Sequence, residues 1–172
     1  MLFSNYQPEY KPACLSIFEG NAPYYFAPQE KDKFLSFLNR IGLSYFVIKS
    51  KVDGVIACGG YSLSENNTVA WLRWDMVRSS HHQQGLGTYL TLGRMALICN
   101  EKQVATIHVG TSQHTYPFYE KMGFDIYQMT KNGIASGIDE YRLCLNFDEY
   151  KRETIKREWR MINNGQKLHN DR

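Results

Sequence analysis

Long hydrophobic runs, metal-binding spacings and linker sequences are all missing from this chain of 172 residues. No segment approaches the ~18 consecutive apolar residues of a membrane span, so no membrane partner is expected. The N-terminus lacks the basic start and apolar stretch of a signal peptide, and we therefore expect a cytoplasmic protein. The four cysteines form no CxxC pair and have no Cys/His spacing that suits zinc. We expect buried thiols in a reducing compartment, and no metal site.

An excess of one sign of charge is found only near the C-terminus. Residues 151–172 contain seven basic and three acidic side chains, whereas the preceding 150 residues contain 13 basic and 14 acidic ones. The sequence pI near 8.6 is therefore a property of the C-terminal segment and says little about what the rest binds. No RNP-like or helix-turn-helix signal accompanies this segment, so nucleic acid is not an expected partner.

The sequence also contains no repeat, low-complexity stretch or Pro/Gly/Ser-rich linker. We therefore predict one domain over residues 1–147, followed by a charged helical extension over residues 148–172. Asp148 caps this last helix, which is expected to run to about Asn163. Its apolar residues are spaced for a single stripe: Tyr150, Ile155, Trp159 and Ile162. Such a stripe packs either on the body of the chain or on a second copy in a homodimer.

Periodicity, turn residues and glycines predict helices and strands throughout the first 147 residues. Helices are expected at Glu9–Phe18, Gln29–Asn39, Leu86–Asn100 and Thr115–Met122. Strands are expected at Ser44–Ser50, Val55–Leu63, Val69–Arg78, Val104–Gly110, Phe124–Thr130 and Tyr141–Phe147, with turns at Asp53-Gly54 and Asn132-Gly133. The fold class is mixed α/β (α+β), with a mainly antiparallel sheet and one central crossover.

The segment that carries chemistry is residues 77–90, VRSSHHQQGLGTYL, which predicts a strand end, a loop with two glycines and a helix start. Backbone N–H groups at a helix N-terminus form an anion site, because four donors lack partners and the dipole end is positive. Glycine at positions 85 and 87 lets a pyrophosphate approach the main chain, which a Cβ would block. The longer nucleotide patterns GxGxxG and GxxxxGK[ST] are absent, so the two glycines alone do not identify the ligand.

Two motifs together resemble the GCN5-related N-acetyltransferase (GNAT) superfamily. The segment His82-Gln-Gln-Gly85-Leu-Gly87 is similar to its acetyl-CoA loop, [R/Q]-x-x-G-x-[G/A], which follows a strand with a β-branched end. The segment Phe118-Tyr119-Glu-Lys-Met-Gly123-Phe124 is similar to the family's F-Y-E-K-x-G-F helix end, and the order of elements from Tyr6 to Phe147 also matches. His82 departs from the family's Arg or Gln. Because imidazole is largely neutral at pH 7, it would help a pyrophosphate only weakly.

The resemblance implies the GNAT fold, a mixed sheet of six to seven strands flanked by helices, here with an extra C-terminal helix. It implies an N-acetyltransferase that moves the acetyl group of acetyl-CoA to a primary amine by direct attack through a tetrahedral intermediate. The implied cofactor contacts are Met76, Val77, His82, Gln83, Gln84, Gly85, Leu86, Gly87, Thr88, Ser112 and Tyr119. The acceptor is a small-molecule or peptide amine that the sequence leaves open. The alternative is a non-catalytic acetyl-CoA-binding sensor, which the departure at His82 motivates.

Tyr119 occupies the position of the family's general acid, which protonates the leaving thiolate. Strand alternation predicts one face with Trp71, Arg73, Asp75 and Val77 and another with Leu72, Trp74 and Met76. Asp75, or a water that it holds, is the candidate base, and Arg73 could tether a substrate carboxylate. An Arg73–Asp75 ion pair and deprotonation through water alone are the alternatives.

Three further residues lie near the expected acceptor pocket. Tyr24 and Tyr25 are in the loop that forms part of this pocket in the family, so they are expected either to contact the substrate or to pack as a lid. His114 precedes the second motif and is a base or a helix-capping neighbour.

Overall fold

The computed structural model describes residues 1–40 and 44–170, with side chains as far as Gly165. Seven strands form one sheet in the order β1-β2-β3-β4-β5-β7-β6. They are β1 (Leu2–Asn5), β2 (Tyr45–Ser50), β3 (Gly54–Leu63), β4 (Val69–Val77), β5 (Thr106–Ser112), β6 (Asp125–Ala135) and β7 (Ile138–Asn146). All neighbouring pairs are antiparallel except β4 and β5, which are parallel.

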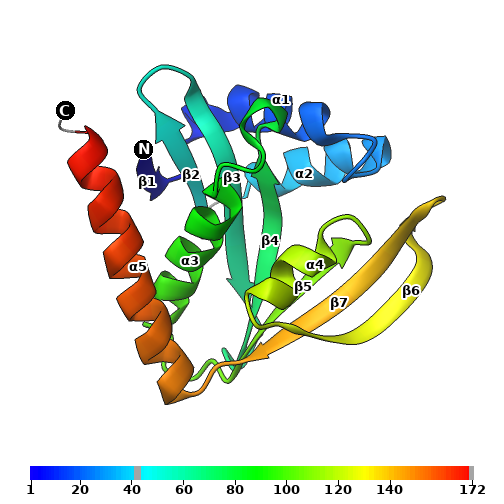
Figure 1. The fold of residues 1–172 in the computed structure, drawn as a ribbon. Coiled ribbons are helices and arrows are strands. Elements are labelled where there is room, and N and C mark those ends of the chain that lie inside the picture. The colour runs from blue at the N-terminus through cyan, green and yellow to red at the C-terminus, as the bar shows by residue number, and fades with distance from the viewer. Residues whose placement is uncertain (41–43, 171–172) are drawn as a thin grey trace.

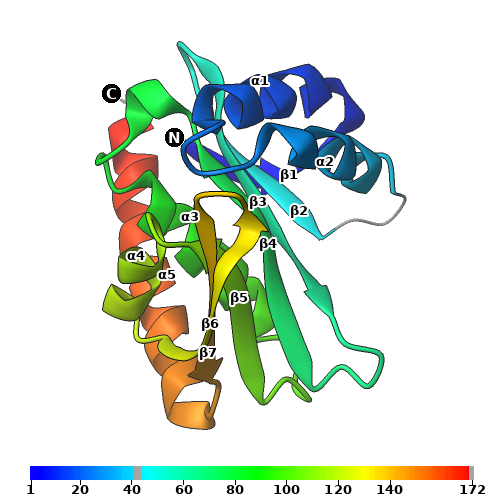
Figure 2. The same cartoon turned by 90° about the vertical axis from the view of Figure 1, so that its right-hand side faces the viewer.

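Helices cover both faces of this sheet (Figure 2). One face is covered by α1 (Lys11–Asn21) and α2 (Lys31–Leu38), and the other by α3 (Leu86–Ile98), α4 (Tyr116–Lys121) and α5 (Glu149–Asn170). Each layer has its own apolar core, because both faces of the central strands are buried. The predicted fold class, a mainly antiparallel sheet with one parallel crossover, is confirmed.

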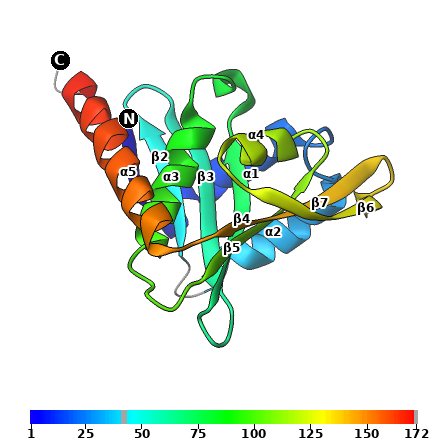
Figure 3. The same cartoon turned by 60° about the horizontal axis from the view of Figure 1, so that its bottom comes forward.

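The predicted elements form with ends shifted by a few residues, but one strand was not predicted and one turn prediction is wrong. The strand without a prediction is β1, which is four residues long and exists because it pairs with β2, with Leu2 opposite Lys49. The turn predicted at Asn132-Gly133 lies within β6, and the hairpin instead turns between Ala135 and Ile138. This hairpin projects beyond the rest of the sheet (Figure 3).

The C-terminal helix α5 is longer than predicted and packs on its own chain. It continues to Asn170 instead of ending near Asn163. Trp159 on its inner side stacks on Tyr89 of α3 at 5.0 Å and meets Phe3 of β1 edge-on at 5.3 Å. The buried Arg152 donates to main-chain carbonyls between Ile98 and Val104. The expected packing on the body is therefore confirmed, whereas a homodimer stays a prediction.

No helix in the part of the chain that the structure describes is both long and apolar enough to cross a membrane.

Candidate functional site

The strands β4 and β5 diverge after a short stretch of pairing (Figure 1). The two strands pair only from Val69 to Trp71, although β4 stays paired with β3 as far as Val77 and β5 stays paired with β7 as far as Ser112. The edge of β4 after Trp71 therefore faces open space instead of a neighbouring strand. A cleft of about 900 Å³ lies there. An exposed strand edge offers main-chain donors and acceptors to an extended ligand.

The glycine loop, which the sequence predicted between β4 and α3, forms one end of this cleft. Gly85, Leu86, Gly87, Thr88 and Gln83 all line it. Within the described chain, no acceptor is found for the N–H groups of residues 83–88, at the start of α3. Gly85 has φ +77°, and no atom lies within 4 Å of the place where a Cβ would stand. The loop is thus an open cradle of donors at a helix N-terminus, which suits a phosphate group.

His82 faces the end of β4. Its Nε2 lies 2.9 Å from the carbonyl oxygen of Val77, so this nitrogen carries the proton that it donates. The Nδ2 of Asn21, at the end of α1, donates to the same oxygen at 2.9 Å. The two side chains therefore fix the position where strand becomes loop. The contribution of His82 to cofactor binding stays a prediction.

The floor of the cleft contains a buried polar cluster of Asp75, Arg94 and Tyr119. Arg94 of α3 is fully buried, and its two Nη atoms donate to the two carboxylate oxygens of Asp75, with 2.9 Å between Nη2 and Oδ2. The Tyr119 hydroxyl donates to the same Oδ2. The remaining donors of Arg94 reach Leu90 O, Gly60 O and Thr91 Oγ1. Each guanidinium nitrogen of Arg94 therefore has an acceptor, which matters because a buried charge without partners is strongly destabilising.

This cluster shifts the protonation equilibria of two of its members. Burial raises the pKa of Tyr119 well above its usual value, the Asp75 carboxylate raises it further, and Arg94 acts in the opposite direction. For Arg94, burial lowers the pKa, but Asp75 and Tyr119 outweigh it, so that the pKa of the guanidinium is raised. Tyr119 is therefore a protonated phenol and Arg94 a cation at neutral pH.

A bulge in β4 overturns the predicted faces of this strand. Cys58 pairs with Met76 and Gly60 with Arg73, so β4 has one extra residue, and Trp74 takes φ +51°. Beyond the bulge the alternation is reversed. Asp75 therefore points to α3 and α4, whereas Arg73 lies on the opposite face. The predicted shared face is wrong, and the Arg73–Asp75 ion pair is wrong because Asp75 pairs with Arg94.

Gly59 makes room for the displaced carboxylate. A Cβ at this position would lie 3.1 Å from Asp75 Oδ1 and 3.2 Å from Arg94 Nη1. The base role of Asp75 stays a prediction, which the geometry disfavours because both of its oxygens already accept hydrogen bonds.

Aromatic side chains form a wall of the cleft opposite α3. Tyr24 stacks on His114 at 4.0 Å, and Tyr25 meets His82 edge-on at 5.5 Å. The α1–α2 loop is thereby joined to the loops that follow β4 and β5. Tyr25 and His114 line the cleft, whereas Tyr24 lines a smaller adjoining hollow of about 380 Å³. Lid packing and substrate contact both fit this placement of the two tyrosines.

The other predicted cofactor residues are placed as follows. Met76 is buried in the core beneath α1 and α2, so it can contribute only its main chain. Ser112 lines the cleft, and its Oγ accepts the N–H of His114 at 3.4 Å. Gln84 does not line the cleft; its side-chain amide donates to Ser80 O.

Sequence reasoning missed Asn21, Glu30 and Arg94. Glu30, just before α2, lines the cleft and accepts the N–H of Ala27 through Oε2 at 2.9 Å. Burial raises the pKa of Glu30, although the Ala27 N–H and the charge of Lys33 oppose this. Arg94 did leave a signal in the sequence, since it is a lone charge within the apolar helix LGRMALI.

Comparisons with known proteins give matches in sequence and in fold. Residues 42–126 match a family model described as an acetyltransferase (GNAT) domain. Ard1 from Thermoplasma volcanium superposes with a TM-score of 0.72 at 16% identity, over 86% of this chain and 98% of that one. The ribosomal-protein-S18-alanine N-acetyltransferase from Escherichia coli gives 0.69 at 18% identity, over 84% and 92%.

An aminoglycoside 6'-N-acetyltransferase complexed with coenzyme A gives a TM-score of 0.67 at 16% identity, over 85% of this chain and 97% of that one. At these identities the likeness establishes the fold. A search of curated protein sequences gives no significant match.

Proposed function

We propose that this chain, whose resemblance to the GNAT superfamily is confirmed in sequence and in fold, is a working N-acetyltransferase that transfers the acetyl group of acetyl-CoA to a primary amine. The observation that carries the proposal is the continuity of the cleft. The unpaired edge of β4 leads directly into the donor-rich loop at the start of α3. An extended ligand with an anionic end fits both parts at once.

Acetyl-CoA has these two features, and the residues present fit it. The N–H groups of residues 85–88 would hold its pyrophosphate, and the edge of β4 after Trp71 would pair with its amide-containing arm. At Val77 only the N–H is available for this, because the carbonyl oxygen already accepts from His82 and Asn21. When bound, it supplies an acetyl group activated as a thioester. The open space at Gly85 is what a ligand close to the main chain requires.

Tyr119 is the proposed general acid. The leaving thiolate needs a proton, and a phenol with a raised pKa still holds its proton at neutral pH. Asp75 and Arg94 fix the hydroxyl at the floor of the cleft, so they act as positioning residues. The amine must lose a proton before it attacks, and water in the cleft is the proposed route because Asp75 is occupied.

The second candidate is an acetyl-CoA-binding module without turnover. Two observations favour it: His82 stands where the family has Arg or Gln, and both oxygens of Asp75 are engaged. Both candidates share the cytosol as the proposed compartment, which the four free cysteines support.

Thermal unfolding with and without acetyl-CoA tests the cofactor part of the proposal. A ligand that binds only the native state stabilises it by RT ln(1 + [L]/Kd), about 2.7 kcal/mol at 100 Kd. We expect a clear rise in Tm, followed by CoA release when a panel of primary amines is added. A rise in Tm without CoA release from any amine favours the binding module, and no rise at millimolar acetyl-CoA refutes both candidates.

A further inference from the structure

Two side chains of opposite charge stand without an ion-pair partner in the part of the cleft beneath α1 and α2. Three carboxylates line the cleft: Glu30, Asp75 and Glu140. Asp75 pairs with Arg94, and Glu140 pairs with Arg142 at 3.2 Å. Within the described residues, no ion pair is formed by Glu30. Its Oε2 accepts the Ala27 N–H, and no hydrogen bond to Oε1 is found among the described residues.

Arg73 is the matching cation on β4. Its Nε donates to Ser62 Oγ at 3.1 Å, and its guanidinium lies over the ring of Trp71 at 5.3 Å. No carboxylate in the described part of the chain pairs with it, and burial together with the neighbouring Arg40 lowers the pKa of Arg73. Two cations near one another without an anion favour the binding of a carboxylate. The planar fork of Arg73 is preorganised for one by its two contacts.

An aromatic pair lines the same cleft as the two charged groups. Trp74 follows Arg73 in the bulge, and Phe26, four residues before Glu30, stacks on Trp74 at 6.2 Å. The lining therefore combines an anionic group, an apolar pair and a cationic group. Two further cations line the cleft: Arg142, which pairs with Glu140, and Lys121 of α4.

We propose that the acceptor is an amino carboxylate, whose ammonium group binds Glu30 and whose carboxylate binds Arg73, with an apolar chain between them against Phe26 and Trp74. The proposal rests on the acetyltransferase function and names its substrate class. The same chemistry is present in free ω-amino acids and in peptides with an acidic residue near a free N-terminus.

The carboxylate is not adjacent to the amine. Arg73 leans toward Trp71, where β4 and β5 are still paired, whereas Tyr119, the proposed acid, contacts Asp75 beyond the bulge. At 3.2–3.4 Å per residue, the strand from Trp71 to Asp75 spans on the order of 10 Å even with the bulge. The amine must reach the acetyl group, which the proposed roles place beside Tyr119, so a chain of several bonds has to separate it from the carboxylate.

A matched series of acceptors tests this proposal. The probes are ω-amino carboxylates with one to seven methylene groups and the n-alkylamines of equal length, each assayed by CoA release with the full chain. We expect kcat/KM to favour the carboxylate over the alkylamine by about tenfold at the best length, and that length to exceed one methylene. Short peptides with Glu or Gln at the second position then distinguish a peptide from a free amino acid.

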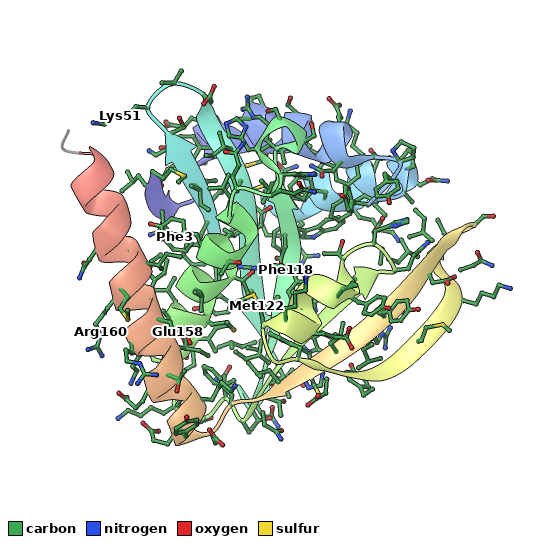
Figure 4. The ribbon with its side chains drawn as sticks, viewed as in Figure 1. Phe3, Lys51, Phe118, Met122, Glu158 and Arg160 are labelled. Atoms are coloured by element: carbon green, nitrogen blue, oxygen red, sulfur yellow. The ribbon has the colours of Figure 1, made fainter. Side chains whose placement is uncertain are left out.

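Two variants locate the charged contacts. Arg73→Gln should lower the carboxylate-to-alkylamine ratio of kcat/KM about tenfold, whereas Glu30→Gln should raise KM for both kinds of amine. Arg160→Gln removes the same charge from the outer side of α5, far from the cleft (Figure 4), and should leave the ratio unchanged. Calorimetric titration of 6-aminohexanoate and hexylamine into the free chain gives a readout that needs no turnover.

The outcomes separate the two proposals. Acetylation without preference for the carboxylate, or an equal loss for both probes in Arg73→Gln, overturns the acceptor assignment and leaves the transferase standing. A chain that binds no acetyl-CoA overturns the transferase, and the acceptor assignment falls with it.

Discussion

Replacing Arg94 with methionine tests the buried cluster on which the proposed site rests. Arg94 is fully buried and donates to both oxygens of Asp75, to two carbonyls and to Thr91. Methionine fills much of the same volume but leaves the carboxylate without its cation. Breaking a buried pair by removing one partner costs about 3–5 kcal/mol of unfolding free energy. For a chain of this size, about 2–4 °C per kcal/mol gives a fall in Tm of roughly 6–20 °C.

Denaturant unfolding of the single and double variants measures this effect. The double variant Arg94→Met/Asp75→Asn removes both charges, so it should be more stable than the sum of the two single losses predicts, by about 2 kcal/mol. Arg160→Met at the exposed outer side of α5 is the matched control and should change stability by no more than about 0.5 kcal/mol. A loss below about 1 kcal/mol in Arg94→Met, or strict additivity in the double variant, would refute the argument.

Three further predictions concern catalysis, the cofactor loop and the last helix. Tyr119→Phe should lower kcat by about 10²-fold without changing the Kd of acetyl-CoA, and an equal loss of rate and binding would indicate a packing role. Because the pKa of Tyr119 is raised, kcat of the wild type should fall only at a pH above the usual tyrosine range. Gly85→Ala should weaken acetyl-CoA binding more than tenfold in calorimetry. The control is Gly54→Ala at the β2–β3 turn, which has the same left-handed strain and open space and should lose only about 1–2 kcal/mol of stability. Equal affinities for acetyl-CoA in the two variants would contradict the proposed loop contact. Trp159→Ala should lower the free energy of unfolding by about 3 kcal/mol because it removes the ring contacts with Phe3 and Tyr89. The side chain of Met161 is 72% exposed, so Met161→Ala should be nearly neutral in the same denaturant titration.

Local patterns predicted the glycine loop, for which we propose binding through the main chain. The free N–H groups of the segment from His82 to Thr88 can be predicted from adjacent residues alone, because a glycine loop followed by a helix start leaves the first N–H groups of the helix without acceptors. Residues 118–124 likewise predicted the short helix that brings Tyr119 to the cleft. Such features depend on spacing along the chain and need no knowledge of distant partners.

Partnerships between distant side chains could not be predicted in the same way. Alternation placed Asp75 beside Arg73, and one extra residue in β4 reversed that order. Asn21 carried no signal because it donates to Val77 O on a strand far away in sequence, and Glu30 carried none because it lines a cleft formed mostly by distant segments.

The sequence by itself therefore determined the fold class and the glycine loop at a helix start, which follow from local periodicity and turn residues, while the site position of Tyr119 followed from the resemblance of residues 118–124 to a family motif. Only the tertiary structure decided that Asp75 pairs with Arg94 and that Glu30 and Arg73 line the same cleft without forming an ion pair among the described residues. The physical reason is that burial makes a charge costly unless a partner is at hand. Which partner is at hand depends on strand register and helix packing, which are properties of the whole fold.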